Sequence, residues 1–316
     1  MKFSAGIDLG GTFTKLALMD LDGKIIEREK TPSMIGASPQ ELLADVRRTL
    51  ETMCARAHLP YPPTEGCGIG TPGVVDYPSG TVKMCGAFRW TDEPLREIAT
   101  EVLSCPVAVD TDVNAGMLAD LYFGHAATSS DVIYVSWGTG LGAGIAMARQ
   151  IYHSRHGAMG NFGHTLAEPN RGRLCFCGIR GCLESEIGAR ALVANAQEAM
   201  AEGRASTLAA QDHLTPLKIS LAAQAGDALS IEILGKAVTL LAHTLAVSLS
   251  MLNPDTVIFA GGVSNCLPLV RDVFDRELAR SAPTFALDAI TIRASAFNES
   301  AGVVGAAKLA TLGRTK

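Results

Sequence analysis

The chain has 316 residues, of which 47% are hydrophobic and 19% are charged. This length predicts two domains, each able to bury its own core, since domains usually hold about 100–200 residues. The net charge of −5 and the lack of a basic run argue against a nucleic-acid partner.

The N-terminus, the most apolar stretch and the cysteines indicate the cellular compartment of the protein. An aspartate, Asp8, interrupts the first apolar run before it is long enough for a signal peptide. The most apolar stretch, residues 237–252, is shorter than the ~20 residues that span a bilayer and contains His243. Three of the eight cysteines lie close together. We therefore expect a soluble, cytoplasmic protein with no membrane partner, with reduced thiols and one metal cluster.

The first half of the chain begins with strands and continues with alternating helices and strands. Apolar runs predict strands at residues 3–9, 15–19, 24–26, 67–69 and 107–109. Apolar residues at helical spacing predict helices over residues 39–57 and 94–103.

The second half repeats the opening pattern. A strand at 132–136 runs into a glycine turn at 138–142 and a strand at 143–148, which indicates a duplicated architecture. The elements predicted after this unit are a helix after Asp227 ending near Leu252, a strand at 256–260, a helix at 267–281, a strand at 289–294 and a last helix from 299.

Three glycine turns follow strands and could hold a nucleotide. In Asp8-Leu9-Gly10-Gly11-Thr12, glycines let backbone N–H groups reach phosphate oxygens, and the aspartate can hold Mg²⁺. The alternative is an ordinary hairpin turn. Gly138-Thr139-Gly140 and Gly261-Gly262 are the second and third turns. Together they favour a nucleotide held between domains.

Residues 68–73 match the pattern G-x-G-x-x-G but do not indicate a dinucleotide site. Pro72-Gly73 does not start a helix, which that motif requires. We interpret the segment as a rigid loop whose backbone lines a pocket.

The segment Asp110-Thr111-Asp112-Val113-Asn114 lies where a strand gives way to a helix. A carboxylate at a strand end can accept a hydroxyl proton during phosphoryl transfer. The alternative is that Asp112 or Asp110 only caps the helix.

The most specific local signal is a set of metal-ligating residues: His164, Cys175, Cys177 and Cys182. One imidazole and three thiolates match a closed tetrahedral Zn²⁺ site, so the metal would be structural. The alternative is chance clustering of buried thiols. Glu184 would be carried into place by this loop, or is a solvated carboxylate.

Together these residues resemble the ROK family of repressors and sugar kinases. The resemblance rests on these motifs: Asp8-x-Gly-Gly-Thr12, Gly70-x-Pro72-Gly73-x-x-Asp76, Asp112-x-Asn114-Ala115, Gly138-Thr139-Gly140, Gly163-His164, the cysteine loop through Glu184, and Asn253-Pro254-Asp255 with Gly261-Gly262. It implies an α/β fold of two actin-like (ribonuclease H-like) domains around a central cleft. Residues 1–115 with 299–316 would form one domain, and residues 116–298, with a zinc loop at about 160–184, the other.

The resemblance also implies ATP, Mg²⁺, structural Zn²⁺ and a homodimer. Asp112 would be the general base in the phosphorylation of a sugar or polyol hydroxyl. The implied cofactor-binding residues are Asp8, Gly10, Gly11, Thr12, Lys15, Gly138, Thr139, Gly140, Gly261 and Gly262. The implied substrate-binding residues are Gly73, Thr111, Asp112, Asn161, His164 and Glu184.

Family repressors carry an added N-terminal helix-turn-helix, whereas this chain begins at the first strand. We therefore expect a kinase, with a non-catalytic sugar-binding regulator as the alternative. The retained Asp8, phosphate turns and Asp112 argue against the regulator, because a sensor needs no base.

Three positions depart from the residues usual in family hexokinases. Thr111 stands for an Asn, Asn161 for a Glu, and Gly86, in an approximate alignment, for another Asn. Sites built to bond particular hydroxyls discriminate strongly when the pairing is lost. We therefore expect that glucose, N-acetylglucosamine and N-acetylmannosamine are not efficient substrates. The alternative is sequence drift in an ordinary glucokinase, with waters filling the gaps.

Overall fold

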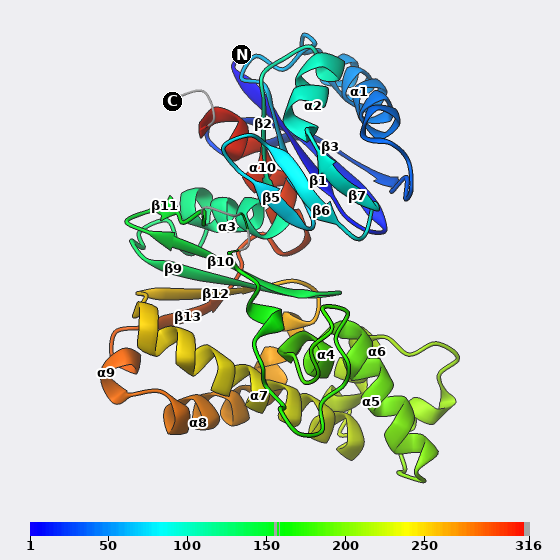
Figure 1. Ribbon diagram of the computed structural model, residues 1–316, viewed down its shortest axis with the longest axis vertical. Coiled ribbons are helices and arrows are strands. Elements are labelled where there is room, and N and C mark those ends of the chain that lie inside the picture. The colour runs from blue at the N-terminus through cyan, green and yellow to red at the C-terminus, as the bar shows by residue number, and fades with distance from the viewer. Residues whose placement is uncertain (155–156, 158, 313–316) are drawn as a thin grey trace. The chain divides into compact units, whose positions relative to one another are not determined.

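The chain folds as two compact units, seen in the computed structural model, which describes residues 1–154, 157 and 159–312 (Figure 1). The first unit comprises Met1–Ser129, Gly144–Met159 and Ser295–Lys316, and the second Ser130–Ala143 and Gly160–Ala294. The chain forms two five-stranded sheets, one within the first unit and one with strands from both units, and helices accompany them. The predicted α/β class is therefore confirmed.

The sheet of the first unit has the order β3-β2-β1-β4-β8. Its strands are β1 (Phe3–Leu9), β2 (Phe13–Asp20), β3 (Ile25–Pro32), β4 (Cys67–Thr71) and β8 (Val107–Thr111). Strands β1, β4 and β8 are parallel, and β2 pairs antiparallel with β1 and β3. The parallel register aligns Asp8 with Gly70 and Gly70 with Asp110, so these residues form one row across the sheet.

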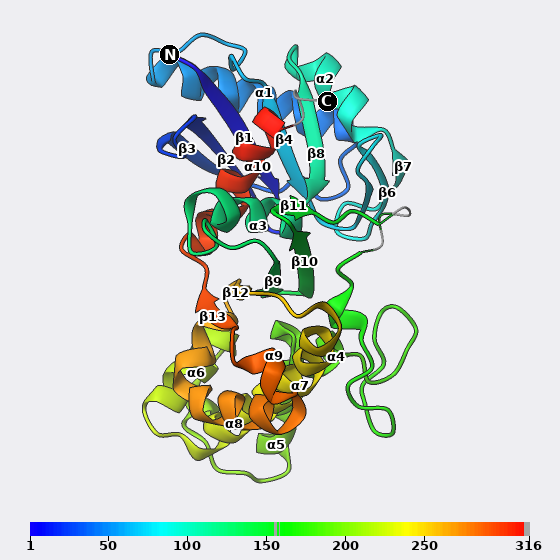
Figure 2. The ribbon, with the colours of Figure 1, turned by 90° about the vertical axis from the view of Figure 1, so that its left-hand side faces the viewer.

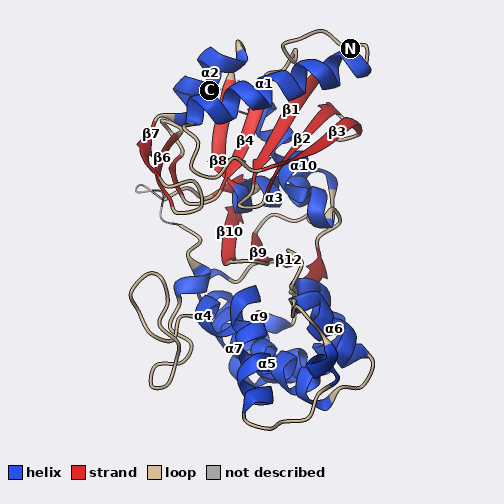
Figure 3. Ribbon diagram, turned by 90° about the vertical axis from the view of Figure 1, so that its right-hand side faces the viewer, coloured by secondary structure: helices blue, strands red, loops and turns tan. Residues whose placement is uncertain are grey.

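The two faces of this sheet differ because side chains alternate along a strand. Phe3, Ile7 and Leu9 of β1 belong to a core shared with helices α1 (Pro39–Arg56) and α2 (Leu95–Leu103). The other face carries α3 (Asp112–Phe123) and α10 (Ala301–Leu312), as Figure 3 shows for α10 beside β1 and β2. Asp8, Gly70 and Asp110 fall on this second face, out of phase with the apolar positions.

Glycines allow α10 to approach both the sheet and α3 closely. A Cβ atom on Gly6 would lie 1.9 Å from the carbonyl oxygen of Val303, and one on Gly305 would lie 1.5 Å from that of Ala115. Only a hydrogen fits at these positions. Replacing Gly305 would therefore separate two helices that pack against the site-bearing face.

We expect Gly305→Ala to lower the free energy of unfolding by about 3 kcal/mol, the upper end of the range for overpacked cores. The matched control is Gly235→Ala in α7, where an added Cβ meets no atom within 4 Å. That change should instead stabilise by up to about 1 kcal/mol, because alanine favours a helix. Urea denaturation of both variants tests this, and equal midpoints would contradict the packing argument.

A small antiparallel sheet, β5-β6-β7, was not predicted from the sequence. It comprises β5 (Val74–Asp76), β6 (Thr81–Cys85) and β7 (Trp90–Glu93). The segment predicted as a loop at 68–73 is also partly strand, since β4 continues to Thr71. Gly73 then turns the chain at φ 103°, and a Cβ there would lie 2.1 Å from the carbonyl oxygen of Met84.

The second five-stranded sheet has the order β11-β10-β9-β12-β13. Its strands are β9 (Val132–Trp137), β10 (Leu141–Met147), β11 (Gln150–Ile151), β12 (Thr256–Ala260) and β13 (Thr291–Ala294). The apolar side chains Ile133, Val135 and Trp137 alternate along β9 into the core of the second unit. The limit between the two units falls within β10.

Several α-helices belong to the second unit (Figure 2). They are α4 (Leu183–Ile187), α5 (Ala189–Ala201), α6 (Pro216–Gln224), α7 (Ala228–Leu252), α8 (Arg271–Ser281) and α9 (Thr284–Leu287). The helix predicted over 267–281 begins later than expected. Residues Ser264–Val270 form a 3₁₀ helix containing Pro268, which lacks the N–H that an α-helix needs.

Helix α7 has the predicted limits. Asp227 caps its N-terminus by accepting a hydrogen bond from the Ser230 amide, and Asn253 ends it in the left-handed conformation. Among the described helices, α7 has the length and composition of a membrane span, but 56% of its most apolar window is buried. Its leucines, including Leu241 and Leu245, lie in the core of the second unit, which accounts for their apolar character.

The limits of the two units differ from the predicted division at residues 115/116 and 298/299. Helix α3, which that division would cut, lies wholly in the first unit. The reason is its packing against α10, which the close approach of Gly305 and Ala115 permits.

Candidate functional site

The row of Asp8, Gly70 and Asp110 is the base of the candidate site in the first unit. Because Gly70 has no side chain, the first turn of α3 packs directly on it: a Cβ there would lie 3.3 Å from Cα of Asp112 and 3.0 Å from Cβ of Ala115. Asp112 is therefore held over the middle of the row, with Asp8 and Asp110 on either side in the sheet. This juxtaposition depends on strand register and cannot be seen in the sequence.

Asp8 has a carboxylate suited to a cation. Its pKa is raised to about 6, because burial and the negative charge of Asp112 together outweigh the lowering effect of Lys15. Lys15 Nζ lies 4.0 Å from Asp8 Oδ2 and donates a hydrogen bond of 2.9 Å to the carbonyl of Glu299. Gly302 leaves room for the carboxylate, since a Cβ there would lie 2.5 Å from it. A divalent cation would relieve the repulsion between Asp8 and Asp112, so these residues fit Mg²⁺.

The turn after Asp8 is a tight hairpin. The Gly10 amide donates to the carbonyl of Phe13 at 3.1 Å. Gly11 and Thr12 are exposed, as donors to a phosphate would need to be. The segment is therefore a hairpin turn, and its exposed residues next to Asp8 are also compatible with binding a phosphate.

Asp112 is the first residue of α3 rather than its N-cap. Thr111 is the cap, since its Oγ1 accepts a hydrogen bond of 3.1 Å from the Asn114 amide. Asp112 Oδ1 accepts from the Val113 amide at 2.9 Å. Burial raises the pKa of Asp112, and Asp110 raises it further, against the lowering effect of that hydrogen bond. The N-cap role belongs to Thr111, and the Asp112 carboxyl group is buried beside Asp110.

Asp110 makes several hydrogen bonds that the sequence did not predict. Its side chain is 1% exposed, and Oδ1 accepts from the Thr111 amide at 2.7 Å and from Asn114 Nδ2 at 2.8 Å. Oδ2 lies 2.6 Å from Nε2 of His153. The imidazole in turn stacks on the Tyr77 ring at 3.7 Å. His153 carries no motif around it, so no sequence signal pointed to it.

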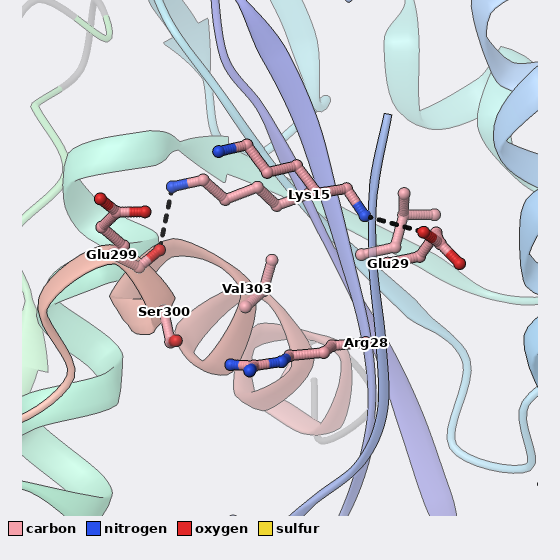
Figure 4. A pocket seen from close by; sticks show the side chains of 8 residues that line it. Lys15, Arg28, Glu29, Glu299, Ser300 and Val303 are labelled. Carbon is pink, nitrogen blue, oxygen red and sulfur yellow. Dashed lines mark hydrogen bonds between the residues drawn. The ribbon is translucent and has the colours of Figure 1, made fainter. Parts of the chain in front are cut away.

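A pocket of about 280 Å³ opens beside Lys15 on the first unit. Figure 4 shows Lys15 of β2 and Arg28 of β3 on the same side as Glu299 and Ser300, which lie in the 3₁₀ turn Asn298–Ser300, and Val303 of α10. Glu29 is turned toward Arg56, whose Nη2 lies 2.8 Å from it. The pocket lining is therefore mixed in charge, with Lys15, Arg28 and Lys30 beside Glu29 and Glu299, and it is connected to Asp8 through Lys15.

In the second unit, the other two glycine turns lie next to each other. A Cβ on Gly138 would lie 3.9 Å from the amide of Gly262. Gly138 donates to the carbonyl of Gly140 at 2.9 Å, which closes the turn around Thr139. Gly261 adopts φ 90°, and a Cβ there would lie 2.5 Å from the carbonyl of Trp137. The structure thus brings Gly138, Thr139, Gly140, Gly261 and Gly262 together.

Glu184, in the short helix α4, contacts the same turns. Its Oε2 accepts a hydrogen bond of 2.7 Å from the Leu141 amide, and a Cβ on Gly140 would lie 2.9 Å from that oxygen. Trp137 Nε1 also donates to the carbonyl of Ile187 at the end of α4. The alternative of a freely solvated Glu184 carboxylate is therefore wrong: α4 is tied to the glycine turn.

The predicted metal ligands converge. The ligand atoms of His164, Cys175, Cys177 and Cys182 all lie within 4.8 Å of one another. His164 Nδ1 lies 3.4 Å from Cys175 Sγ, and the Sγ atoms of Cys177 and Cys182 are 3.5 Å apart. A tetrahedral Zn²⁺ with bonds of about 2.3 Å to sulfur places sulfurs about 3.8 Å apart, so the cluster is compatible with zinc.

Glycines shape this loop. Gly178 and Gly181 have φ of 89° and 80°, and a Cβ on Gly181 would lie 1.8 Å from the carbonyl of Glu168. Asn161 lies at the other end of the loop, just before the 3₁₀ turn Phe162–His164. His164 and Asn161 are thus held by one turn, since the His164 amide donates to the carbonyl of Asn161 at 2.9 Å.

Comparison with known proteins decides the family. The ROK family model matches residues 4–312, which is nearly the whole chain. The chain belongs to the ROK family. The resemblance inferred from the motifs is thereby confirmed.

Relatives of this ROK chain include enzymes and regulators. It is 28% identical to a glucokinase from Halalkalibacterium halodurans over 96% of this chain and 93% of the relative. It is 31% identical to a xylose repressor from Caldicellulosiruptor bescii over 82% of this chain and 65% of the repressor. A ROK family glucokinase from Streptomyces griseus, solved with glucose and AMPPNP, superposes with a TM-score of 0.82 at 30% identity, covering 97% of this chain and 98% of that one.

Proposed function

We propose that this ROK protein is an ATP-dependent kinase of a sugar or sugar-like polyol, with Asp112 as the general base. The observation that carries the proposal is the placement of Asp112 over Gly70 between Asp8 and Asp110, with burial raising the pKa of both Asp8 and Asp112. Similarity to glucokinases supports the same reaction class.

In the proposed reaction, the Asp112 carboxylate accepts the proton of the attacking hydroxyl. The hydroxyl oxygen then forms a bond to the γ-phosphorus of ATP as the bond from that phosphorus to the β–γ bridging oxygen breaks, which releases ADP. Asp8 would hold Mg²⁺, which offsets charge on the phosphates. Backbone N–H groups of Gly10, Gly11, Thr12, Gly138, Thr139 and Gly140 would donate to phosphate oxygens, with Lys15, Gly261 and Gly262 beside them.

Substrate hydroxyls would be bound by Gly73, Thr111, Asn161, His164 and Glu184. The zinc cluster would have a structural role in this scheme. A closed set of three thiolates and one imidazole leaves no position for a reacting water. Its effect would be to hold the loop from His164 to Glu184, and through Glu184 the turn at Gly140.

A second candidate is a non-catalytic sugar-binding regulator, favoured by the similarity to xylose repressors. A regulator needs a sugar site but no base at Asp112 and no cation ligand at Asp8. We therefore place the kinase first. The proposal further includes a cytoplasmic homodimer without a nucleic-acid or membrane partner.

The experiment that tests the function is ATP turnover over a panel of hexoses, amino sugars, rare sugars and cyclitols. We expect transfer to at least one of them, and a kcat/KM for glucose below the ~10⁴ M⁻¹s⁻¹ at which true substrates begin. The reason is that Thr111 stands in place of the Asn, and Asn161 in place of the Glu, that are usual in the family's hexokinases. A kcat/KM for glucose above that value would contradict the substrate prediction. Sugar binding without any turnover would favour the regulator.

A further inference from the structure

We propose that His153 is a positioning residue: through its contact with Asp110 it holds the first turn of α3, and with it Asp112, in the reactive position. The inference rests on the proposed function of Asp112. It concerns a residue that neither the motifs nor the reaction scheme uses.

The contact joins a buried acid to a residue from a distant part of the chain. Asp110 Oδ2 and His153 Nε2 are 2.6 Å apart, while Asp110 is 1% exposed. With Asp110 as a carboxylate, whose oxygens only accept, this contact requires a proton on Nε2 of His153. A buried acceptor that loses its partner forces its neighbours to rearrange, and Asp110 is buried.

The other oxygen of Asp110 transmits the constraint to α3. Oδ1 accepts from the Thr111 amide and from Asn114 Nδ2. Thr111 is the N-cap and Asn114 lies in the first turn, so the residue before Asp112 and the residue two positions after it are held by the same carboxylate. A rotation of Asp110 toward a new donor would therefore move the start of the helix.

The imidazole itself is held in place. Its ring stacks on Tyr77 with centroids 3.7 Å apart and planes within 8°. Gly157 also lies close to β5, because a Cβ there would lie 2.3 Å from the carbonyl of Val75. His153 thus connects the turn after β5 to Asp110, in the row of residues under Asp112.

The closing experiment compares two amides that differ by one methylene. The side chain of Gln reaches as far as Nε2 of His, whereas that of Asn does not. We expect His153→Asn to lower kcat for sugar phosphorylation by about 10- to 100-fold with KM for ATP within about twofold, since a misplacement of about 1 Å can cost 10²-fold. His153→Gln should restore kcat to within about threefold of wild type. The remote control is His213→Asn, at an exposed histidine in the second unit.

A second readout does not depend on catalysis. Hydrogen exchange of the peptide covering Thr111 to Leu118 should be faster in His153→Asn than in the His153→Gln and His213→Asn variants, because the Val113 and Asn114 amides bond within that turn. If His153→Asn does not fold, Tyr77→Leu, which removes the stacked ring, should give the same accelerated exchange. Wild-type kcat and exchange in His153→Asn, or a His153→Gln variant as impaired as His153→Asn, would overturn the proposal. Faster exchange in a protein that phosphorylates no sugar would retain the positioning role and reject the kinase.

Discussion

Replacing Asp112 with Asn should lower kcat by about 10²–10⁴, the usual contribution of a general base. The amide has the same size and still accepts a hydrogen bond from the Val113 amide, so the first turn of α3 should remain folded. It cannot accept the proton of a hydroxyl at neutral pH. Steady-state kinetics on the substrate found in the panel, with circular dichroism as a fold control, tests this.

The pH dependence of kcat/KM is a second test of Asp112 as the general base. Burial and the charge of Asp110 raise the pKa of Asp112, and burial together with the charge of Asp112 raises that of Asp8 to about 6. A protonated Asp112 cannot act as base, so wild-type kcat/KM should fall as the pH drops through a midpoint above the ordinary aspartate value of about 4.

The residual kcat/KM of Asp112→Asn should fall less with decreasing pH than that of the wild type, because the Asn side chain does not take up a proton in this range. Thr111→Ser, which keeps the capping hydroxyl of α3, is the matched control and should retain the wild-type acid limb. A variant with unchanged kcat, or with an unchanged acid limb, would remove Asp112 from the base role.

The second large effect concerns the metal cluster. We expect purified protein to contain about one Zn²⁺ per chain and Cys182→Ser to contain almost none, since a closed site needs all four ligands. Activity should fall by about 10²-fold or more. The reason is that Cys182 directly precedes α4, whose Glu184 holds the Leu141 amide next to the glycine turn.

Cys105→Ala is the control, because this thiol is also buried but lies in the first unit, 3.5 Å from Cys67 Sγ. It should keep both zinc and activity. Elemental analysis and kinetics measure the two quantities. Zinc-free protein from an unchelated preparation, or full activity in Cys182→Ser, would contradict a structural zinc site.

Much of the candidate site could be predicted from short stretches of the sequence. The spacing of His164, Cys175, Cys177 and Cys182 predicted one cluster, and their ligand atoms converge. Residues this close in the chain are constrained by a single loop, and its glycines reveal the required turns. The limits of α7 were predicted for the same reason, since its cap Asp227 and its stop at Asn253 are neighbours of the helix they bound.

Other features were decided by residues far apart in the chain. The sequence shows Asp8, Gly70 and Asp110 as three separate strand ends, and only the register of β1, β4 and β8 places them in one row under Asp112. The contact of His153 with Asp110 spans 43 residues and has no periodic or motif signal.

By itself the sequence determined the family, the α/β class and the local ligand sets, because each of these depends on short-range spacing and turn chemistry. The tertiary structure decided which carboxylates share a site, which helix approaches them and which side chain supports the base. Those outcomes depend on strand register and on backbone packing at glycines such as Gly70 and Gly305, where the missing Cβ matters only once a distant helix has arrived.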